Sequence, residues 1–408
     1  MPSMESALAS VSDLVGEAHV RAATPADAAA GVVPMLVAEP GGEAEMAALL
    51  RLASRTGLAV VPRGTGSSLD WGEPPRRCDL LVSTARLRGV LDHAAADMVA
   101  VIRAGTPLGE IQSVLGAAPH RQRVALDPPL AGSLGGILAT NRAGGLRQLH
   151  GTPRDLLLGA RFVLADGTMA SSGGRVVKNV AGYDVGRLLC GSLGTLAVLV
   201  EATVKLHPLP AARHDVVLEG ARADRLGAAV EALRTSAARP AAIDVHWPDG
   251  LLRVRCEGTE AGAGAAARLV AEAVGGRIVS SPERLEELDA SLHGRPWGGE
   301  GLIAGVGIPR TALAALLGAC SEVAAEVVVR AGVGAAEARL PADAAALIGL
   351  RAAVEGLGGH LSLRRGGSLL PGLVWPDGDE AAAGLTRALK AELDPTGTLS
   401  PGRQQGGV

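Results

Sequence analysis

Aromatic residues are scarce in this chain, which holds one Phe, one Tyr and four Trp among 408 residues. Hydrophobic residues still make up 48% of the sequence, so Ala, Val and Leu must fill the core, and few rings remain to stack on a ligand. A chain of this length exceeds one ordinary compact domain, and two domains are therefore expected.

Cysteines are also few. The four of them, Cys78, Cys190, Cys256 and Cys320, lie far apart, and none belongs to a Cys-x-x-Cys pair. This spacing argues against a disulfide framework, a zinc ribbon or an iron–sulfur cluster. We expect reduced thiols, and for Cys190, beside a glycine turn, the role of a small buried residue.

Long apolar runs and runs of one charge are missing as well. No 18 apolar residues follow one another, and the first 30 residues carry Glu5, Asp13 and Glu17 without an apolar stretch of signal-peptide length. The net charge is −3, and aromatic and basic residues do not interleave. The sequence predicts a soluble, cytoplasmic protein with no membrane span and no nucleic-acid partner.

Hydrophobic periodicity predicts an α+β chain. In the first half, a helix over 43–56 should end at Gly57, and Thr106 should cap a helix over 108–115. Strands are predicted at 32–37, 58–61, 80–83, 99–103, 156–164 and 197–206.

After Pro208-Leu209-Pro210, which has the character of a linker, Ala-rich amphipathic helices alternate with short strands. This pattern predicts a second α+β domain with an antiparallel sheet and covering helices. The expected divisions are an N-terminal extension over 1–29, a first domain over 30–208 and a second domain over 211–403. The predicted helices span 221–237, 261–274, 311–325 and 344–355, and the strands include 243–246 and 251–256.

The loop Arg63-Gly64-Thr65-Gly66-Ser67-Ser68 follows a predicted strand. Glycines allow backbone amides to approach a phosphate, while the arginine and the hydroxyls add donors, so the loop suits a pyrophosphate. A plain turn between strands is the alternative. The nicotinamide fingerprint is excluded because Leu69 stands at its third glycine, and no Gly-x-x-x-x-Gly-Lys-Ser/Thr loop is present.

Two further glycine-rich stretches lie at 127–145 and 183–198. One such stretch is compatible with an ordinary turn. Three of them within about 130 residues favour one extended ligand held by backbone contacts.

Taken in order, these segments resemble the FAD-linked oxidases of the vanillyl-alcohol oxidase (PCMH) type, and among them the FAD-binding subunits of glycolate oxidases. The resemblance is strong over about 30–208 and is limited elsewhere to His360 and the C-terminus. It is carried by Glu39-Pro40, the 62–68 loop, Gly132-Ser133-Leu134-Gly135-Gly136, Asp166-Gly167-Thr168, the segments 178–184 and 191–195, Asp394-Pro395 and Pro401-Gly402-Arg403.

The resemblance implies a PCMH-type FAD-binding domain of two α+β subdomains and a C-terminal α+β cap domain, with FAD between the subdomains. Relatives with a covalently attached flavin commonly carry a histidine in the first loop; Ser67 stands here, so non-covalent FAD is expected. The implied FAD-binding residues are Arg63, Gly64, Thr65, Gly66, Ser67, Ser68, Asp127, Gly132, Ser133, Gly135, Gly136, Thr140, Asn141, Gly191, Ser192, Gly194, Val198 and Arg403.

Residues for substrate chemistry are less sharply marked. Relatives that oxidise 2-hydroxy acids directly carry a His-x-x-x-x-x-x-His metal pair in the C-terminal domain, whereas here only His207 and His214 have that spacing, on either side of the linker. We therefore predict no metal. His360 is the candidate base, with a structural role on a strand or turn as the alternative.

Two further pairs of residues have both a functional and a structural interpretation. Arg364 and Arg365 suit a substrate carboxylate or an exposed strand face, while Lys178 and Tyr183 suit either a position near the flavin or purely structural roles.

A reduced flavin needs an electron acceptor, and the chain holds no iron–sulfur or haem ligand set. The resemblance implies a glycolate oxidase complex with a second flavin subunit and an iron–sulfur subunit that passes electrons toward the membrane. Two other hypotheses stay open: a self-sufficient dehydrogenase of a 2-hydroxy acid such as D-lactate, and a scaffold that has lost its cofactor.

Overall fold

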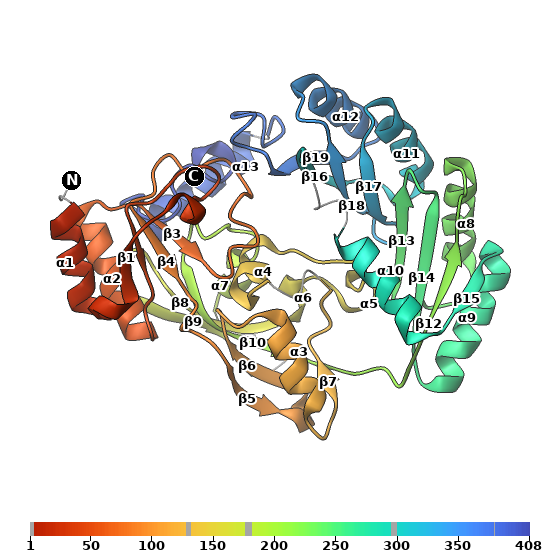
Figure 1. Cartoon of the computed structure of the whole chain (residues 1–408), viewed down its shortest axis with the longest axis horizontal. Coiled ribbons are helices and arrows are strands. Elements are labelled where there is room, and N and C mark those ends of the chain that lie inside the picture. Colours follow the sequence, from red (N-terminus) through yellow and green to blue (C-terminus); the bar gives the residue numbers. More distant parts are fainter. Residues whose placement is uncertain (1–3, 128–131, 176–181, 295–299, 379) are drawn as a thin grey trace.

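The computed structural model describes residues 4–127, 132–175, 182–294, 300–378 and 380–408. They form two lobes (Figure 1): the first lobe comprises residues 4–208 together with 380–408, and the second lobe comprises residues 212–375. Both lobes mix helices with sheets, which confirms the predicted α+β class. Within the described segments, no helix combines the length and the apolar character that a membrane crossing requires.

A four-stranded sheet opens the first lobe, in the order β1-β2-β4-β3. Its strands are β1 (Val20–Ala22), β2 (Leu36–Ala38), β3 (Val60–Arg63) and β4 (Leu80–Ser83). The last three run parallel, and α1 (Met4–Val15) and α2 (Glu43–Thr56) pack on them. α2 has the bounds predicted from the sequence and ends at Gly57, whose φ of 70° lies in the left-handed region.

A five-stranded antiparallel sheet, ordered β5-β6-β10-β8-β9, completes the first lobe. Its strands are β5 (Val90–Ala94), β6 (Val99–Arg103), β8 (Leu157–Val163), β9 (Met169–Gly173) and β10 (Val198–Lys205). The accompanying helices are α3 (Leu108–Ala117), α4 (Leu134–Thr140), α5 (Arg147–His150), α6 (Pro153–Leu156) and α7 (Val185–Leu189). A short pair, β7 (Gln122–Arg123) with β11 (His207–Pro208), lies where the chain leaves the lobe.

Two local predictions were wrong. The strand expected at 32–37 starts only at Leu36, because the chain first makes a tight turn in which Ala29 and Val32 bond to each other. Thr106 does not cap α3: its hydroxyl donates to the Arg103 carbonyl at 2.7 Å and accepts the Gly89 N–H at 2.9 Å. The hydroxyl fixes a strand connection instead.

The second lobe is built on an eight-stranded antiparallel sheet, ordered β15-β12-β14-β13-β17-β18-β16-β19. This confirms the antiparallel sheet with covering helices that the sequence predicted. The strands are β12 (Ala212–Leu218), β13 (Ala242–Trp247), β14 (Leu251–Gly258), β15 (Arg277–Val279), β16 (Leu302–Gly307), β17 (Glu326–Arg330), β18 (Ala335–Leu340) and β19 (His360–Arg365).

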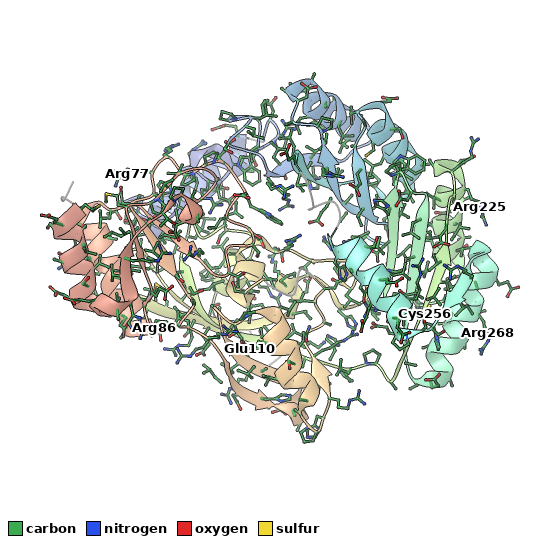
Figure 2. All side chains as sticks on the ribbon, viewed as in Figure 1. Arg77, Arg86, Glu110, Arg225, Cys256 and Arg268 are labelled. Carbon is green, nitrogen blue, oxygen red and sulfur yellow. The ribbon has the colours of Figure 1, made fainter. Side chains whose placement is uncertain are left out.

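The two faces of this sheet differ in character. One face packs its Val, Leu and Ala side chains against four outer helices, from which exposed arginines such as Arg225 and Arg268 project (Figure 2). The other face carries charged side chains, and α10 (Pro282–Gly294) covers part of it. The outer helices are α8 (Ala223–Thr235), α9 (Glu260–Val274), α11 (Leu313–Glu322) and α12 (Ala344–Gly356).

After the second lobe, the chain returns to the first. α13 (Glu380–Leu393) and the residues after it lie beside the four-stranded sheet (Figure 1), where Leu399 forms a parallel bridge with Val60. The buried ammonium of Lys390 donates to the carbonyls of Thr195 and Leu399 at 2.6 and 2.7 Å and pairs with Asp394. The C-terminal segment is thus part of the first lobe's packing.

Candidate functional site

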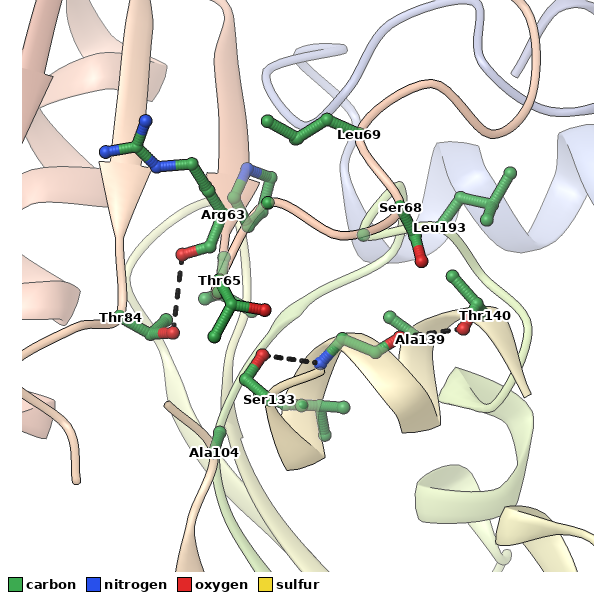
Figure 3. A pocket seen from close by; sticks show the side chains of 18 of the residues that line it. Arg63, Thr65, Ser68, Leu69, Thr84, Ala104, Ser133, Ala139, Thr140 and Leu193 are labelled. Atoms are coloured by element: carbon green, nitrogen blue, oxygen red, sulfur yellow. Dashed lines mark hydrogen bonds between the residues drawn. The ribbon is translucent and has the colours of Figure 1, made fainter. Parts of the chain in front are cut away.

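The loop after β3 lines a cavity of about 740 Å³, partly open to solvent, between the two sheets of the first lobe (Figure 3). The second and third glycine-rich stretches form its other walls, so the structure brings together the three segments that the sequence singled out. The predicted FAD-binding residues that line it are Arg63, Gly64, Thr65, Gly66, Ser67, Ser68, Ser133, Gly135, Gly136, Thr140, Ser192, Gly194, Val198 and Arg403.

The loop offers its backbone amides to this cavity. Within the described part of the chain, the N–H groups of residues 65–68 donate no hydrogen bond, and the hydroxyls of Thr65, Ser67 and Ser68 form none either. Among the described residues that line the cavity, none has a carboxylate side chain. A run of free N–H groups without opposing negative charge fits a pyrophosphate.

The guanidinium of Arg63 does not face the cavity. It forms an ion pair with Asp27 at 2.8 Å, and Arg21 binds the same carboxylate at 2.7 Å. The hydrogen bonds from Arg21, the Thr24 backbone and Arg63 hold the pKa of Asp27 far below its usual range. Since this charge is already neutralised, backbone amides and hydroxyls are the donors that remain for a phosphate.

Two glycines let the loops approach each other closely. A Cβ on Gly64 would overlap the hydroxyl of Ser133. A Cβ on Gly135 would lie 2.9 Å from the Cβ of Ala104. Ser133 in turn accepts the Gly136 N–H at the start of α4 (Figure 3). These glycines shape the cavity by allowing contact between protein segments.

Arg403 supports the first loop from behind. Its buried guanidinium donates to the carbonyl of Leu69 at 2.6 Å and to that of Trp71. Desolvation lowers the pKa of this arginine to about 10. The C-terminal segment therefore holds the end of the first loop in place.

Four predicted residues lie elsewhere. Asn141 and Gly191 line a second, neighbouring cleft. Asp127 is buried and accepts the Leu146 N–H at 2.9 Å, and the Gly132 carbonyl accepts the Leu108 N–H. The Asp127 carboxylate and the Gly132 carbonyl serve the packing of the first lobe, and neither residue lines the first cavity or the second cleft.

The second cleft, an open space of about 1700 Å³, lies between the lobes and meets the first cavity at Thr140 and Leu193, which line both. Its far wall is the charged face of the second lobe's sheet, where His360, Ser362 and Arg364 alternate along β19. One continuous space thus joins the amide-lined cavity to a polar wall.

Two glycines on β16 seat the side chains of β19. A Cβ on Gly307 would overlap the ring of His360, and a Cβ on Gly305 would lie 2.9 Å from Nη2 of Arg364. Arg364 is also held from its other side, because its guanidinium carbon lies 4.4 Å from the ring centroid of Trp71 in the first lobe. Its position is therefore fixed by both lobes.

Positive charge dominates the cleft. Of the cleft-lining residues that the structure describes, four are arginines (Arg142, Arg147, Arg330 and Arg364) and one is a carboxylate, Glu337. Desolvation lowers the pKa of Arg142, Arg147 and Arg364, only partly offset by nearby carboxylates such as Glu337. A cleft with this charge attracts anions.

Other candidates from the sequence lie outside this space. Arg365 does not line the cleft, and the ring of Tyr183 is 95% exposed. His207 packs on His150, with ring centroids 4.4 Å apart, whereas His214 bonds to Ser280. Lys178 falls outside the described residues.

Sequence reasoning missed several cleft residues, namely Trp71, Arg142, Arg147, Arg330, Glu337 and Trp375. One signal was available for the wall itself: His360, Ser362 and Arg364 recur at every second residue, which places them on one face of a strand. For the others, only the meeting of the lobes brings them together.

Comparison with known proteins agrees with this arrangement. A family model described as an FAD binding domain matches residues 34–173. An uncharacterised FAD-linked oxidoreductase of Mycobacterium tuberculosis is 36% identical over 208 residues, and a D-lactate dehydrogenase of Archaeoglobus fulgidus is 36% identical over 178. These matches cover 51% and 42% of this chain but only 45% and 39% of the two relatives.

The glycolate oxidase subunit GlcE of Escherichia coli is 32% identical over 246 residues, which are 58% of this chain and 67% of that protein. Among solved structures, a 4-ethylphenol oxidase from Gulosibacter chungangensis superposes with a TM-score of 0.76 at 17% identity, covering 97% of this chain and 96% of the other. The fold is therefore shared over nearly the whole length of both.

Proposed function

Because this chain belongs to the FAD-linked oxidoreductases of the vanillyl-alcohol oxidase (PCMH) type, with FAD as its cofactor, we propose that it oxidises a 2-hydroxy acid to the 2-oxo acid. The observation that carries the proposal is the continuous space in which the amide-lined cavity meets the cationic cleft at Thr140 and Leu193. A cofactor phosphate in the first part and an organic acid in the second would place their reactive groups near that junction.

The residues of the first cavity would hold FAD without a covalent bond. The N–H groups of residues 65–68 and the hydroxyls of Ser133 and Ser192 would receive the pyrophosphate and its neighbours. When bound, FAD supplies the two-electron acceptor for the hydride that leaves the substrate's Cα.

His360 is the proposed proton acceptor. Its imidazole lines the cleft and forms no hydrogen bond with any described residue, so it is available to take the proton of the substrate hydroxyl. Arg364 would hold the carboxylate. Loss of the hydroxyl proton to His360 and of the Cα hydride to the acceptor balances the conversion of alcohol to ketone.

For the finer role we propose an FAD-binding subunit of a glycolate-oxidase-type complex. The GlcE match supports it, and so does the lack of an iron–sulfur or haem ligand set in the sequence, since electrons must then leave through a second flavin subunit and an iron–sulfur subunit. The cleft favours a second candidate, a self-sufficient 2-hydroxy-acid dehydrogenase, because it already contains a base and carboxylate-binding arginines.

One preparation tests these alternatives. The purified chain, loaded with FAD, should turn colourless when 2-hydroxy acids are added without oxygen, and acid precipitation should release the flavin into the supernatant. Persistent flavin colour with every 2-hydroxy acid would overturn the proposed reaction for the isolated chain. Bleaching that appears only with co-purified partner chains would establish the subunit role over the self-sufficient one.

A further inference from the structure

We propose that the cleft selects 2-hydroxy acids that carry a second acidic group, in preference to glycolate and other monocarboxylates. The inference rests on the proposed oxidation of a 2-hydroxy acid, without glycolate as the preferred substrate, and narrows the substrate class. It follows from the positions and partners of the four arginines that line the cleft.

Two of these arginines already have carboxylate partners. Arg142 lies 3.7 Å from Glu337, and Arg330 binds Asp244 at 2.9 Å. Their charges are balanced within the protein, so they contribute less to the binding of a ligand.

The other two have no carboxylate partner among the described residues. Neither the guanidinium of Arg147 nor that of Arg364 forms an ion pair or hydrogen bond with them. Partly buried arginines normally find acceptors, because an unpaired desolvated charge is costly. Two such cations in one cleft leave room for two anionic groups.

Their placement suits one ligand with two acidic ends. Arg147 belongs to α5 of the first lobe, and Arg364 belongs to β19 of the second, so the cations approach the cleft from opposite lobes. The positive charge of Arg147 also contributes to the lowered pKa of Arg364, after burial and the charge of Arg142. Two anionic groups would relieve that repulsion, whereas glycolate provides one.

The setting of Arg364 adds specificity. Gly305 leaves room beside the guanidinium and the Trp71 ring lies against it, so a ligand would approach along the edge of the guanidinium plane. A planar carboxylate or a phosphate meets that edge with two parallel hydrogen bonds. Nearby, the buried Nε1 of Trp375 has no partner among the described residues and offers one more donor to the same space.

Binding can be measured apart from turnover. Two of the four tryptophans line the cleft, so tryptophan fluorescence of the FAD-loaded chain should report ligands that are not oxidised. We expect 2-oxoglutarate to bind about tenfold more tightly than glyoxylate or pyruvate, as one additional charge-assisted contact would give. Equal affinity for mono- and diacids would overturn the proposal.

Variants assign the preference to residues. Arg147→Met should reduce the diacid affinity about tenfold and leave the monoacid affinity within a few-fold, whereas Arg364→Met, which removes the proposed carboxylate contact, should weaken diacids and monoacids alike. Arg339→Met is the matched control, because this arginine is bound by Glu326 and does not line the cleft. Should one variant fail to fold, the other and the wild-type comparison still decide. Unchanged selectivity in a folded Arg147→Met protein would overturn the assignment.

A reduction assay separates this inference from the proposed function. Malate and 2-hydroxyglutarate, tested as both enantiomers, should bleach the flavin faster than glycolate. The rate with 3-phosphoglycerate shows whether a phosphate serves better than a carboxylate as the second acidic group. Faster bleaching by glycolate would overturn the inference and keep the proposed reaction. Selective diacid binding with no bleaching by any hydroxy acid would overturn the proposed reaction and, with it, the diacid as substrate.

Discussion

The guanidinium of Arg364 stacks on the ring of Trp71 at 4.4 Å, which places a side chain of the second lobe on one of the first. Arg142 approaches the same ring at 5.6 Å. A ring that attracts two cations orders both of them without neutralising either. The positive wall of the cleft therefore depends on how the lobes meet.

Gly305 provides a direct test of that wall. Changing Gly305→Ala adds a methyl group where the Arg364 guanidinium lies, so the arginine must move and diacid affinity should fall about tenfold in the fluorescence titration. Gly349→Ala, on α12, is the control: its added methyl group would meet Val323 Cγ1 at 4.0 Å, an ordinary contact, and should leave affinity unchanged. Unaltered diacid binding by Gly305→Ala would show that the space Gly305 leaves for the Arg364 guanidinium does not matter for binding.

Arg403→Met should weaken FAD binding. Loss of this guanidinium leaves the carbonyls of Leu69 and Trp71 without a donor and releases the end of the first loop, and we expect the dissociation constant of FAD to rise about tenfold or more. Flavin fluorescence titration measures it. Arg387→Met, at an exposed arginine on α13, is the control and should bind FAD like the wild type. An unchanged FAD affinity of Arg403→Met would contradict a role of the C-terminal segment in FAD binding.

Lys390→Met should destabilise the fold. Its ammonium satisfies two buried carbonyls and pairs with a fully buried carboxylate, so its loss should lower the free energy of unfolding by about 3 kcal/mol. Urea denaturation is the measurement. Lys205→Met, a partly exposed lysine at the end of β10, should cost about 0.5 kcal/mol or less. Similar losses in both variants would contradict this role for Lys390.

Stability should fall between about pH 6.5 and 4 because of His150. Burial, with the neighbouring His207, lowers the pKa of His150 to about 4, so the folded state resists a proton that the unfolded chain accepts near its ordinary pKa of about 6.5. This loss of stability is absent above that pH range and grows as the pH falls through it. Allowing for partial exposure, it reaches about 2 kcal/mol.

Denaturation of the wild type and of His150→Gln at pH 7 and at pH 4.5 measures this term. The variant should lose less stability on acidification, since glutamine does not titrate. An equal loss in both proteins would assign the acid sensitivity to other groups.

Much of the fold was predictable because its signals are local. α2 and its Gly57 terminus follow from apolar spacing and one glycine, and β4 and β6 have the bounds that their apolar runs indicate. Thr106 shows the limit of local signals. Its sequence context is that of a helix cap, but its hydroxyl accepts a hydrogen bond from the N–H of Gly89, 17 residues earlier. Such competition depends on tertiary contacts that no local pattern contains.

The candidate site divides in the same way. Residues 63–68 carry their chemistry in one continuous loop, and the structure places that loop in the cavity. The charge on Arg63 was expected to face a phosphate, yet Asp27, 36 residues earlier, binds it. The cationic cleft draws Arg147 and Arg364 from elements more than 200 residues apart, and only the packing of the lobes reveals their relation.

The contacts of Lys390 and Arg403 also bear on the order of events during synthesis. A ribosome delivers the first loop before the second lobe and the residues that support that loop after it, so the first lobe cannot complete its packing until the whole second lobe has emerged. These pairings span nearly 200 residues or more, and contacts so distant in sequence slow folding. Capture of the flavin should accordingly follow translation, and a ribosome that stalls after the second lobe would release a chain whose cofactor cavity still lacks its support.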